Sequence, residues 1–362
     1  MSRNVLRATW HKLIARARSA FNSNVTKNVE FRKEQLKALR RLLVENENVF
    51  VDALKQDLKK PNFETIMTEL EVVKNEITGM LMNIDSWSKP TSVSKTLVTL
   101  FDDVYVYPEP YGIVLIIGAW NYPVQLLLSP LVGAIAAGNC AIVKPSEISP
   151  ATAEVIQRLI PRYLDKDCFH VVTGGPEDTQ QLLKERFDYI FYTGSSTIGK
   201  YVQQMAAKNL TPVTLELGGK SPVYIDESVP NMEVAVRRLL WGKCLNAGQT
   251  CIAPDYVICT PKVQEMVANT ARKVLKEFFG EDPRLTSDYS RIVSEKHFFR
   301  LEKLLESTSG KKIIGGKIHR EERYISPTLI TDVTPKDAIM QEEVLFYSHI
   351  WTVAASSCRQ WS

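Results

Sequence analysis

One cysteine of this chain stands in a sequence setting that suits covalent catalysis. Cys251 follows the small and polar residues 246–250 and precedes a run, residues 256–259, that is typical of a strand. About 35 residues upstream, Glu216 lies in a similarly glycine-rich stretch, residues 215–222. A thiolate can attack a carbonyl group, and a carboxylate can manage a proton or activate water. The two residue types supply the minimum for a thioester cycle, and the spacing shows only that they could meet in a fold.

Four other cysteines lie in a different, apolar sequence setting. The usual place of a free cysteine is a buried apolar position. Four cysteines lie in apolar runs and fit that place: Cys140, Cys168, Cys244 and Cys259. Cys251 lies between a polar turn and Pro254, so the same prediction does not apply to it. Glu216 would be costly to bury without a partner, which favours a functional role for this carboxylate.

The composition is that of a soluble globular protein of about two domains. The chain has 362 residues, of which 44% are hydrophobic and 24% are charged, and its formal net charge is only +4. This balance gives no reason to expect a nucleic-acid partner. Six cysteines without C-x-x-C spacing argue against a metal site and against a disulfide framework, so we expect a reducing, cytoplasmic compartment.

Two segments could be taken for targeting or membrane signals. Residues 1–29 are basic and contain no acid, which resembles a transit peptide, but their apolar residues recur at helical spacing and favour an amphipathic surface helix. Residues 112–143 carry no charge and are long enough to span a bilayer. Polar residues and prolines interrupt them, so a buried strand–helix–strand unit is the better interpretation and no integral membrane segment is expected.

The periodicity predicts an α/β protein with a doubly wound dinucleotide-binding domain and a second α/β domain. The first ninety residues favour helices, and four strands are expected at 112–118, 140–144, 169–172 and 189–192, with helices between them. A second region begins near residue 212, with strands around 212–216, 222–225 and 255–259. We therefore expect helices and a nucleotide-binding domain over 1–211, a catalytic domain over 212–343 and a separate tail over 344–362.

A glycine-containing turn follows the predicted strand 189–192. Gly194 and Gly199 allow a phosphate to approach the backbone, and Ser195 begins a helix whose N-terminus favours negative charge. The pattern G-x-x-x-x-G-K is close to a P-loop, but Tyr201 stands where a magnesium-binding Ser or Thr is required. The turn is therefore predicted to contact the phosphates of a dinucleotide. A nucleoside triphosphatase is the less favoured interpretation.

Two further strand ends carry polar side chains. Lys144 and Glu147 follow the strand 140–144, where ribose hydroxyls and phosphates bind in such sheets, although solvated charges are also common there. Asn121 follows the strand 112–118. Its amide could donate to an oxyanion, or it could be an ordinary turn residue before a tyrosine–proline pair.

Taken together, these motifs resemble the aldehyde dehydrogenase superfamily, most closely its class 3 and fatty aldehyde dehydrogenase branch. The resemblance extends from about residue 11 to residue 343. Six stretches carry it: 119–123 (AWNYP), 144–147 (KPSE), 172–177 (VTGGPE), 192–195 (YTGS), 212–222 (PVTLELGGKSP) and 248–251 (GQTC).

The resemblance implies a role for each matching residue. Cys251 matches the nucleophile that forms a thiohemiacetal and then a thioester with the aldehyde, and Asn121 matches the oxyanion donor. Glu216 matches the glutamate assigned to proton handling. The cofactor residues are implied to be Lys144 and Glu147 at the adenosine ribose, Gly194, Ser195 and Gly199 at the pyrophosphate, and Glu343 at the nicotinamide ribose.

The sequence departs from the family pattern after Glu343, where family members continue with a Phe-Gly-Pro sequence. Residues 344–362 look unrelated to the family, and we expect the catalytic domain to be incomplete at its C-terminus, with sheet edges exposed. The family's oligomerisation segment and hydrophobic membrane anchor are also expected to be absent, although a homodimer remains possible.

The sequence therefore predicts oxidation of aldehydes to carboxylic acids with NAD or NADP. Two alternatives stay open. A catalytically impaired product would bind only the cofactor or a partner, and a thioester-transferring enzyme would pass the acyl group to coenzyme A.

Overall fold

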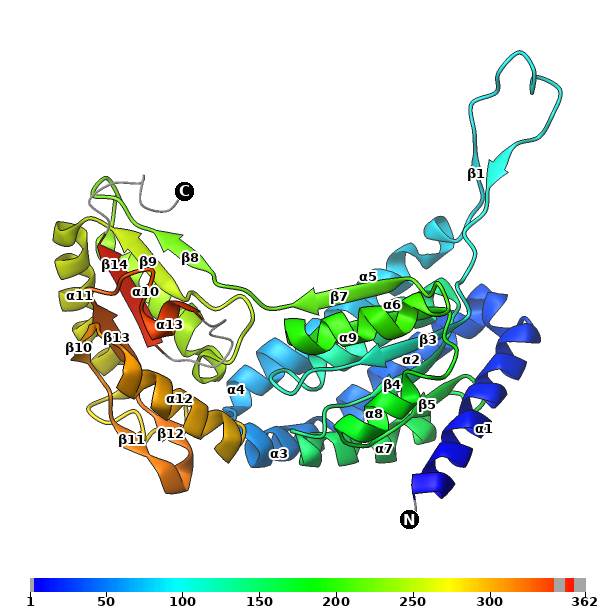
Figure 1. The fold of residues 1–362 in the computed structure, drawn as a ribbon. Helices are drawn as coiled ribbons and strands as arrows, with labels where there is room; N and C mark the ends of the chain where they lie inside the picture. The colour runs from blue at the N-terminus through cyan, green and yellow to red at the C-terminus, as the bar shows by residue number, and fades with distance from the viewer. Residues whose placement is uncertain (1–2, 342–348, 355–362) are drawn as a thin grey trace. The chain divides into compact units, whose positions relative to one another are not determined.

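The computed structural model of the chain describes residues 3–341 and 349–354, and side chains over 10–341. The chain divides into two compact units, which are described separately (Figure 1). The first unit comprises Met1–Ala53 and Thr65–Glu216, and the second comprises Leu54–Glu64 and Leu217–Ser362.

Helices fill the first ninety residues, as predicted. The helices from the N-terminus to the end of the first unit are α1 (Arg3–Asn22), α2 (Val29–Glu45), α3 (Glu47–Leu58), α4 (Asn62–Thr65), α5 (Glu71–Trp87), α6 (Gln125–Ala137), α7 (Pro150–Tyr163), α8 (Pro176–Leu182) and α9 (Ser196–Ala207). The strands of this unit are β1 (Thr91–Ser92), β2 (Tyr105–Val106), β3 (Ile113–Ile117), β4 (Cys140–Lys144), β5 (Phe169–Val171), β6 (Tyr189–Gly194) and β7 (Val213–Leu217). Trp10, Ile14 and Ala17 of α1 are buried, which agrees with the amphipathic helix expected at the N-terminus.

The central sheet of the first unit has the strand order β5-β4-β3-β6-β7. Strand β3 pairs in parallel with both β4 and β6, so the chain starts in the middle, moves to one side and then returns to build the other. Helix α2 packs against α6 and α7, and α1 packs against α8. This is the doubly wound arrangement, and its strand order reverses between β3 and β6. The uncharged segment 112–143 is the buried β3–α6–β4 unit.

Strand β7 shows where the sequence interpretation and the structure differ. The sequence analysis assigns residues 212–216 to the second region, whereas β7 is the edge strand of the first sheet, next to β6. The backbone N–H of Ile190 donates to the carbonyl of Pro212 at 3.1 Å, at the start of this pairing. A strand's hydrophobic pattern does not state which sheet it joins, because pairing depends on residues far away in the chain.

The second unit is also α/β. Its strands are β8 (Pro222–Tyr224), β9 (Tyr256–Cys259), β10 (Lys311–Ile314), β11 (Ile318–His319), β12 (Tyr324–Ile325), β13 (Thr328–Thr331) and β14 (His349–Ala354), and its helices are α10 (Met232–Cys244), α11 (Pro261–Phe279), α12 (Glu295–Ser307) and α13 (Ala338–Gln341). The sheet order is β10-β13-β14-β9-β8, with β10 antiparallel to β13 and the other pairs parallel. One core of this unit joins α10 and α11 to β9.

Strand β14 bears on the expected C-terminal tail. The sequence analysis expects residues 344–362 to form a tail separate from the catalytic domain, yet β14 pairs with β13 on one side and β9 on the other. The tail therefore contributes an inner strand to the sheet of the second unit. Within the described part of the chain, no helix is long and apolar enough to cross a lipid bilayer.

Candidate active site

The loop that follows β3 carries Asn121 and is fixed at several points. The Gly118 N–H donates to the carbonyl of Lys144 at 3.1 Å, and the Ser149 hydroxyl donates to the carbonyl of Trp120 at 2.9 Å. The carboxylate of Glu69, which is fully buried, accepts from the backbone N–H groups of Val124 and Gln125 at 2.9 and 3.0 Å.

These contacts give the loop a defined backbone path at the start of α6. The Glu69 carboxyl group satisfies two of the unpaired N–H groups at the start of the helix. Asn121 is 5% exposed, so its amide sits in a largely water-excluded position. A fixed, desolvated amide is the kind of donor that stabilises a developing oxyanion.

Lys144 and Glu147 are in contact after β4. The Nζ of Lys144 lies 2.9 Å from Oε2 of Glu147, and the lysine side chain is buried while the glutamate is partly exposed. The same Nζ lies 3.4 Å from the carbonyl of Pro145. The ammonium is thus held at the carboxyl end of the strand, with the carboxylate directed toward solvent.

The turn between β6 and α9 contains the predicted phosphate residues. Ser195 is the N-cap of α9, and its hydroxyl oxygen accepts from the Ile198 N–H at 3.4 Å. Gly199 is buried in the first turn of the helix and donates its N–H to the carbonyl of Ser195 at 2.9 Å. A side chain on Gly194 would clash with the hydroxyl of Tyr192, so glycine lets the backbone lie close to this side chain.

These three segments follow β3, β4 and β6, whose carboxyl ends lie at one edge of the sheet. The edge includes the place between β3 and β6 where the strand order reverses. In open α/β sheets, ligands bind in the crevice outside the strand ends at such a reversal, with phosphates at a helix N-terminus. A dinucleotide therefore fits this edge, with Lys144, Glu147 and the β6–α9 turn as its neighbours. The sequence suggested each segment separately, and the structure places all three at the same edge of the sheet.

Glu216 lies near the carboxyl end of β7, at the edge of the same sheet, and is exposed. The cost of burying an unpaired charge, which the sequence analysis used to favour a functional role, does not apply to an exposed carboxylate. That argument was wrong. The position of Glu216 at a strand end still leaves its carboxylate accessible to substrate or water.

Cys251 belongs to the second unit and differs from the other described cysteines. Its residue is partly exposed, whereas the four cysteines predicted to lie in the core are buried. Burial raises the pKa of Cys244 to about 12 and that of Cys259 to about 11, which keeps both thiols protonated at neutral pH. Contact with Cys140 and burial raise the pKa of Cys168 as well. These cysteines are unsuited to nucleophilic attack, because the thiolate is the reactive form.

The backbone before Cys251 follows an unusual path. Asn246, Ala247 and Gly248 have φ values of 52°, 53° and 78°, three successive residues in the left-handed region. Non-glycine residues pay about 1–2 kcal/mol each for this conformation. Such strain persists only where the surroundings impose it, and it occurs often at functional sites.

Gln249 supplies much of that support. Its side chain is fully buried, and its Nε2 donates to the carbonyls of Asn246 and Arg291, each at 2.9 Å. Its Oε1 accepts from the Val293 N–H at 3.0 Å. One amide therefore ties the turn before Cys251 to a segment about 40 residues further along the chain.

Glu64 supports the same turn from the other direction. Its Oε2 accepts from the Asn246 N–H at 2.8 Å, and the residue is 8% exposed. Burial raises the pKa of Glu64 to about 7, against the opposing effects of the Asn246 hydrogen bond and nearby Lys60. The support of the turn thus includes a carboxyl group that titrates near neutrality.

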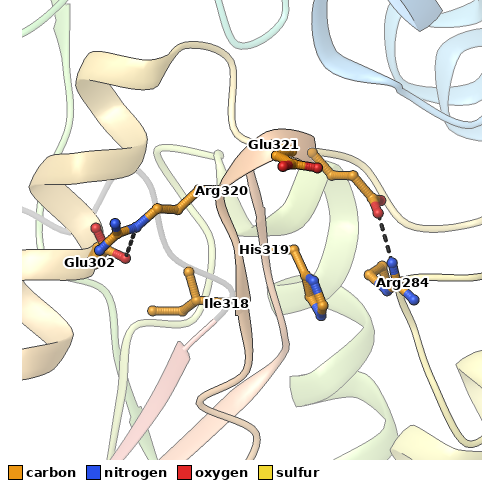
Figure 2. Close-up of a pocket in the computed structure, with 7 residues that line it drawn as sticks. Arg284, Glu302, Ile318, His319, Arg320 and Glu321 are labelled. Atoms are coloured by element: carbon orange, nitrogen blue, oxygen red, sulfur yellow. Dashed lines mark hydrogen bonds and ion pairs between the residues drawn. The ribbon is translucent and has the colours of Figure 1, made fainter.

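Glu343, the predicted nicotinamide-ribose residue, lies outside the described residues. A cavity of about 530 Å³ in the second unit, between α12 and the β11–β12 hairpin, contains none of the predicted site residues (Figure 2). The cations at its rim are already paired, Arg284 with Glu322 at 2.8 Å and Arg320 with Glu302 at 2.9 Å. It does not take part in the candidate site.

Comparison with known proteins decides the family. The model of the aldehyde dehydrogenase family matches residues 3–346, which is nearly the whole chain. The chain belongs to this family. The resemblance seen in its motifs is thereby confirmed, as is the α/β fold.

Aldehyde dehydrogenases of the family 3 group are among the most similar curated proteins. The chain is 48% identical over 332 residues to aldehyde dehydrogenase family 3 member A2 of Macaca fascicularis, covering 91% of this chain and 68% of that protein. It is 47% identical to the dimeric NADP-preferring aldehyde dehydrogenase of Mus musculus, covering 92% of this chain and 73% of that one.

Solved aldehyde dehydrogenase structures share the fold. The substrate-bound AldH of Staphylococcus aureus is 42% identical, with a TM-score of 0.93 over 97% of this chain and 76% of that one. A Mycobacterium tuberculosis aldehyde dehydrogenase complexed with NAD+ is 23% identical, with a TM-score of 0.85, over 98% of this chain and 74% of that one. At that identity the second likeness concerns the fold alone.

In each unit, the structure shows supporting residues that the sequence analysis did not select. Glu69 shapes the Asn121 loop, and Gln249 and Glu64 shape the Cys251 turn. Gln249 stands two residues before Cys251, so the sequence already showed that it belongs to the turn. Glu64 and Glu69 gave no local signal, because their partners are 182 and 55 residues away in the sequence.

Proposed function

We propose that this aldehyde dehydrogenase family member oxidises aldehydes to carboxylic acids with NAD or NADP, through a thioester at Cys251. The observation that carries the proposal is the Cys251 turn. It presents a partly exposed thiol on a strained backbone that buried side chains hold in place. The strand ends of the first unit complement it with residues suited to a dinucleotide.

For the cofactor we propose that Lys144 and Glu147 bind the adenosine ribose and that the β6–α9 turn binds the pyrophosphate. The N-terminus of α9 offers backbone N–H groups to a negatively charged ligand, and Ser195 caps its first turn, which supports this assignment. When bound, the nicotinamide supplies the acceptor for a hydride ion.

For the chemistry we propose that the Cys251 thiolate adds to the aldehyde carbonyl carbon, forming a C–S bond and an oxyanion. Asn121 donates its amide hydrogen to that oxyanion. After the hydride leaves the carbon, the acyl group remains on Cys251 as a thioester. Water then adds to the thioester, the C–S bond breaks, and the thiolate, a carboxylate and two protons result.

Glu216 is proposed to accept the proton of the attacking water or of the Cys251 thiol. Both steps release a proton, and a carboxylate at a strand end can pass it to solvent. Substrates are proposed to be medium or long aliphatic aldehydes or aromatic aldehydes, as the family resemblance implies.

The test is the formation of reduced cofactor by the purified chain, with a medium-chain aldehyde and with NAD and NADP in separate arms. We expect turnover that falls by at least about 10³-fold in Cys251→Ala, because covalent catalysis is lost. Cys259→Ala, which removes a buried thiol, is the control and keeps turnover. Cofactor binding without turnover in the unmodified chain would contradict the proposal, and turnover that requires coenzyme A would replace hydrolysis by acyl transfer.

A further inference from the structure

One ammonium group in the second unit contacts two separate segments. The Nζ of Lys220 lies 2.7 Å from Oδ2 of Asp255 and 3.1 Å from the carbonyl oxygen of Ile339. It also lies 5.7 Å from the centre of the Tyr256 ring. The Lys220 side chain is only 21% exposed and that of Asp255 only 3%, so the ion pair is largely removed from water. An ion pair with so little access to water is screened by salt much less than one on the surface.

The first segment is the end of the Cys251 turn. Asp255 follows Pro254 and begins the approach to β9, and its backbone N–H donates to the carbonyl of Ser221 at 2.9 Å. Asp255 is therefore held twice, by its backbone to Ser221 and by its carboxylate to Lys220. The turn that contains Cys251 is supported before the cysteine by Gln249 and after it by this pair.

The second segment is helix α13. Its start is fixed by Asp337, whose carboxylate accepts from the Ile339 N–H at 3.1 Å and from the Ser309 N–H at 2.8 Å. The helix ends at Gln341, two residues before the predicted cofactor residue Glu343. A contact to the carbonyl of Ile339 therefore sets the position of the helix that leads to that glutamate.

A second lysine approaches Asp255 from α10. Lys243 is fully buried, and within the described part of the chain its Nζ has no hydrogen-bond partner. Burial lowers the pKa of Lys243 to about 8, while the charge of Asp255 opposes that decrease. Helix α10 contacts the turn, since a side chain on Gly242 would meet the ring of Pro254 at 3.4 Å.

This arrangement separates the role of Lys220 from the general stability of the fold. If Lys220 loses its charge, Asp255 still has the Lys243 ammonium nearby, so the buried carboxylate is not left without a counter-charge. If Asp255 loses its charge, both lysines are left uncompensated, which is the costly change. Lys220 is thus the member of the group whose removal leaves the fold intact.

We propose that Lys220 is a positioning residue for the reaction, which clamps the end of the Cys251 turn to helix α13. The clamp fixes the direction of the Cys251 turn relative to the segment that leads to Glu343. The inference rests on the proposed function of Cys251 as the nucleophile. A displacement of a reacting group by about 1 Å can cost about 10²-fold in rate, so a contact of this kind can matter without touching the substrate.

The test compares Lys220→Met with Lys220→Arg, in which a guanidinium can still donate to both oxygens. Lys262→Met is the matched control, because Lys262 forms an ion pair of the same 2.7 Å length with Glu227 but is 71% exposed. Each variant is assayed for kcat and cofactor KM, and amide hydrogen exchange is measured over residues 249–257 and 338–341. Exchange needs no turnover, so it reports on the clamp independently of the reaction.

In Lys220→Met we expect kcat to fall by about 10- to 100-fold, with the cofactor KM changed by less than about threefold. Exchange should rise by about tenfold or more in the two clamped segments and stay unchanged in the sheet of the first unit. Lys220→Arg should restore kcat and the slow exchange of the two segments. Lys262→Met should leave kcat and exchange as they are in the unmodified chain.

Two results would overturn the proposal. Lys220→Met that behaves like Lys262→Met would mean that the contacts do not position the turn. A rise of exchange throughout the second unit, with loss of thermal stability and no rescue by Lys220→Arg, would mean a general structural role. If instead Cys251→Ala keeps full turnover, the proposed function fails, while the exchange data still decide whether the clamp exists.

Discussion

The two parts of the candidate site are built in different ways. In the first unit, the proposed cofactor residues stand at the ends of regular strands and at the start of a helix, where Ser195 caps α9 through a contact three residues away. In the second unit, the Cys251 turn follows three residues with positive φ and is held by side chains that come from distant parts of the chain.

This difference shows where each part gets its precision. A strand end and a helix start have a conformation that local hydrogen bonds already fix, so the cofactor residues need little outside support. The strained turn does not hold itself, and buried polar contacts must keep it in place. We therefore expect substitution of the side chains that hold the strained residues before Cys251 to cost stability, and substitution of the cofactor residues of the first unit to cost mainly cofactor affinity.

The largest effect is expected for Gln249→Ala. The substitution leaves the Arg291 carbonyl and the Val293 N–H without the Gln249 amide and removes one of the two donors to the Asn246 carbonyl, so we expect the free energy of unfolding to fall by about 3–5 kcal/mol. Thermal unfolding monitored by calorimetry measures the loss. Gln204→Ala, on the exposed side of α9, is the control and should change stability by less than about 0.5 kcal/mol. If Gln249→Ala and Gln204→Ala changed the free energy of unfolding equally, the Cys251 turn would not depend on its buried side-chain contacts, and the two units would not differ in this respect.

The next effect concerns pH and Glu64. Its pKa is raised from 4.5 to about 7, so the folded chain holds a proton that the unfolded chain releases between those values. The stabilisation from this group is complete below about pH 4.5 and is lost as the pH rises through 7, a change of about 3 kcal/mol at 1.36 kcal/mol per pKa unit.

The variant Glu64→Gln keeps an acceptor for the Asn246 N–H and removes the titration. We therefore expect the unmodified chain to lose stability relative to this variant as the pH rises from 5 to 8, as measured by denaturant unfolding at each pH. Glu306→Gln on the exposed face of α12 is the control. Parallel pH profiles for the unmodified chain and Glu64→Gln would show that Glu64 is not the titrating group.

A smaller effect, on binding, is expected for Lys144→Met. The lost charge-assisted contact should raise the cofactor KM by about 10- to 100-fold, with kcat reduced by less than about threefold. Lys37→Met is a matched control, since Lys37 pairs with Glu34 across the same three-residue spacing but on the exposed face of α2. Cofactor titration by fluorescence would measure the same change without turnover. An unchanged affinity would place the ribose elsewhere.

The smallest effect is expected for Ser195→Ala. Loss of the cap should cost about 1 kcal/mol of stability and raise the cofactor KM about two- to fivefold, because the first turn of α9 becomes less ordered. Thr260→Ala removes the equivalent cap of α11, where the Thr260 hydroxyl accepts from Val263, and so it is the control for stability. If both variants alter cofactor affinity equally, the α9 turn has no specific role.

The regular elements could be predicted from the sequence because their patterns are local. Strand β4 was predicted over residues 140–144, where it lies in the structure, and α6, α7 and α8 lie between the predicted strands as expected. The short strands β10 to β13 were not predicted, since runs of two to four residues carry too little periodicity. Strand β7 was predicted as a strand, but its sheet depends on pairing that no local pattern contains.

The candidate site could be predicted in part for the same reason. The motifs selected Cys251, Lys144 and Ser195, which lie in turns of the expected kind. The sequence did not select Glu64 or Glu69, because each acts on a turn through a fold that brings together distant segments. The argument from the cost of burying Glu216 did not apply, since a residue near the end of an edge strand can face solvent.

The most direct test of the account is to trap the covalent intermediate. The purified chain is mixed with a medium-chain aldehyde and oxidised cofactor, quenched in acid within one turnover and digested for mass spectrometry. We predict an acyl adduct on the peptide that contains Cys251, which appears only when aldehyde and cofactor are both present and disappears in Cys251→Ala. Turnover without an adduct on that peptide, or an adduct on another cysteine, would contradict the proposed role of Cys251.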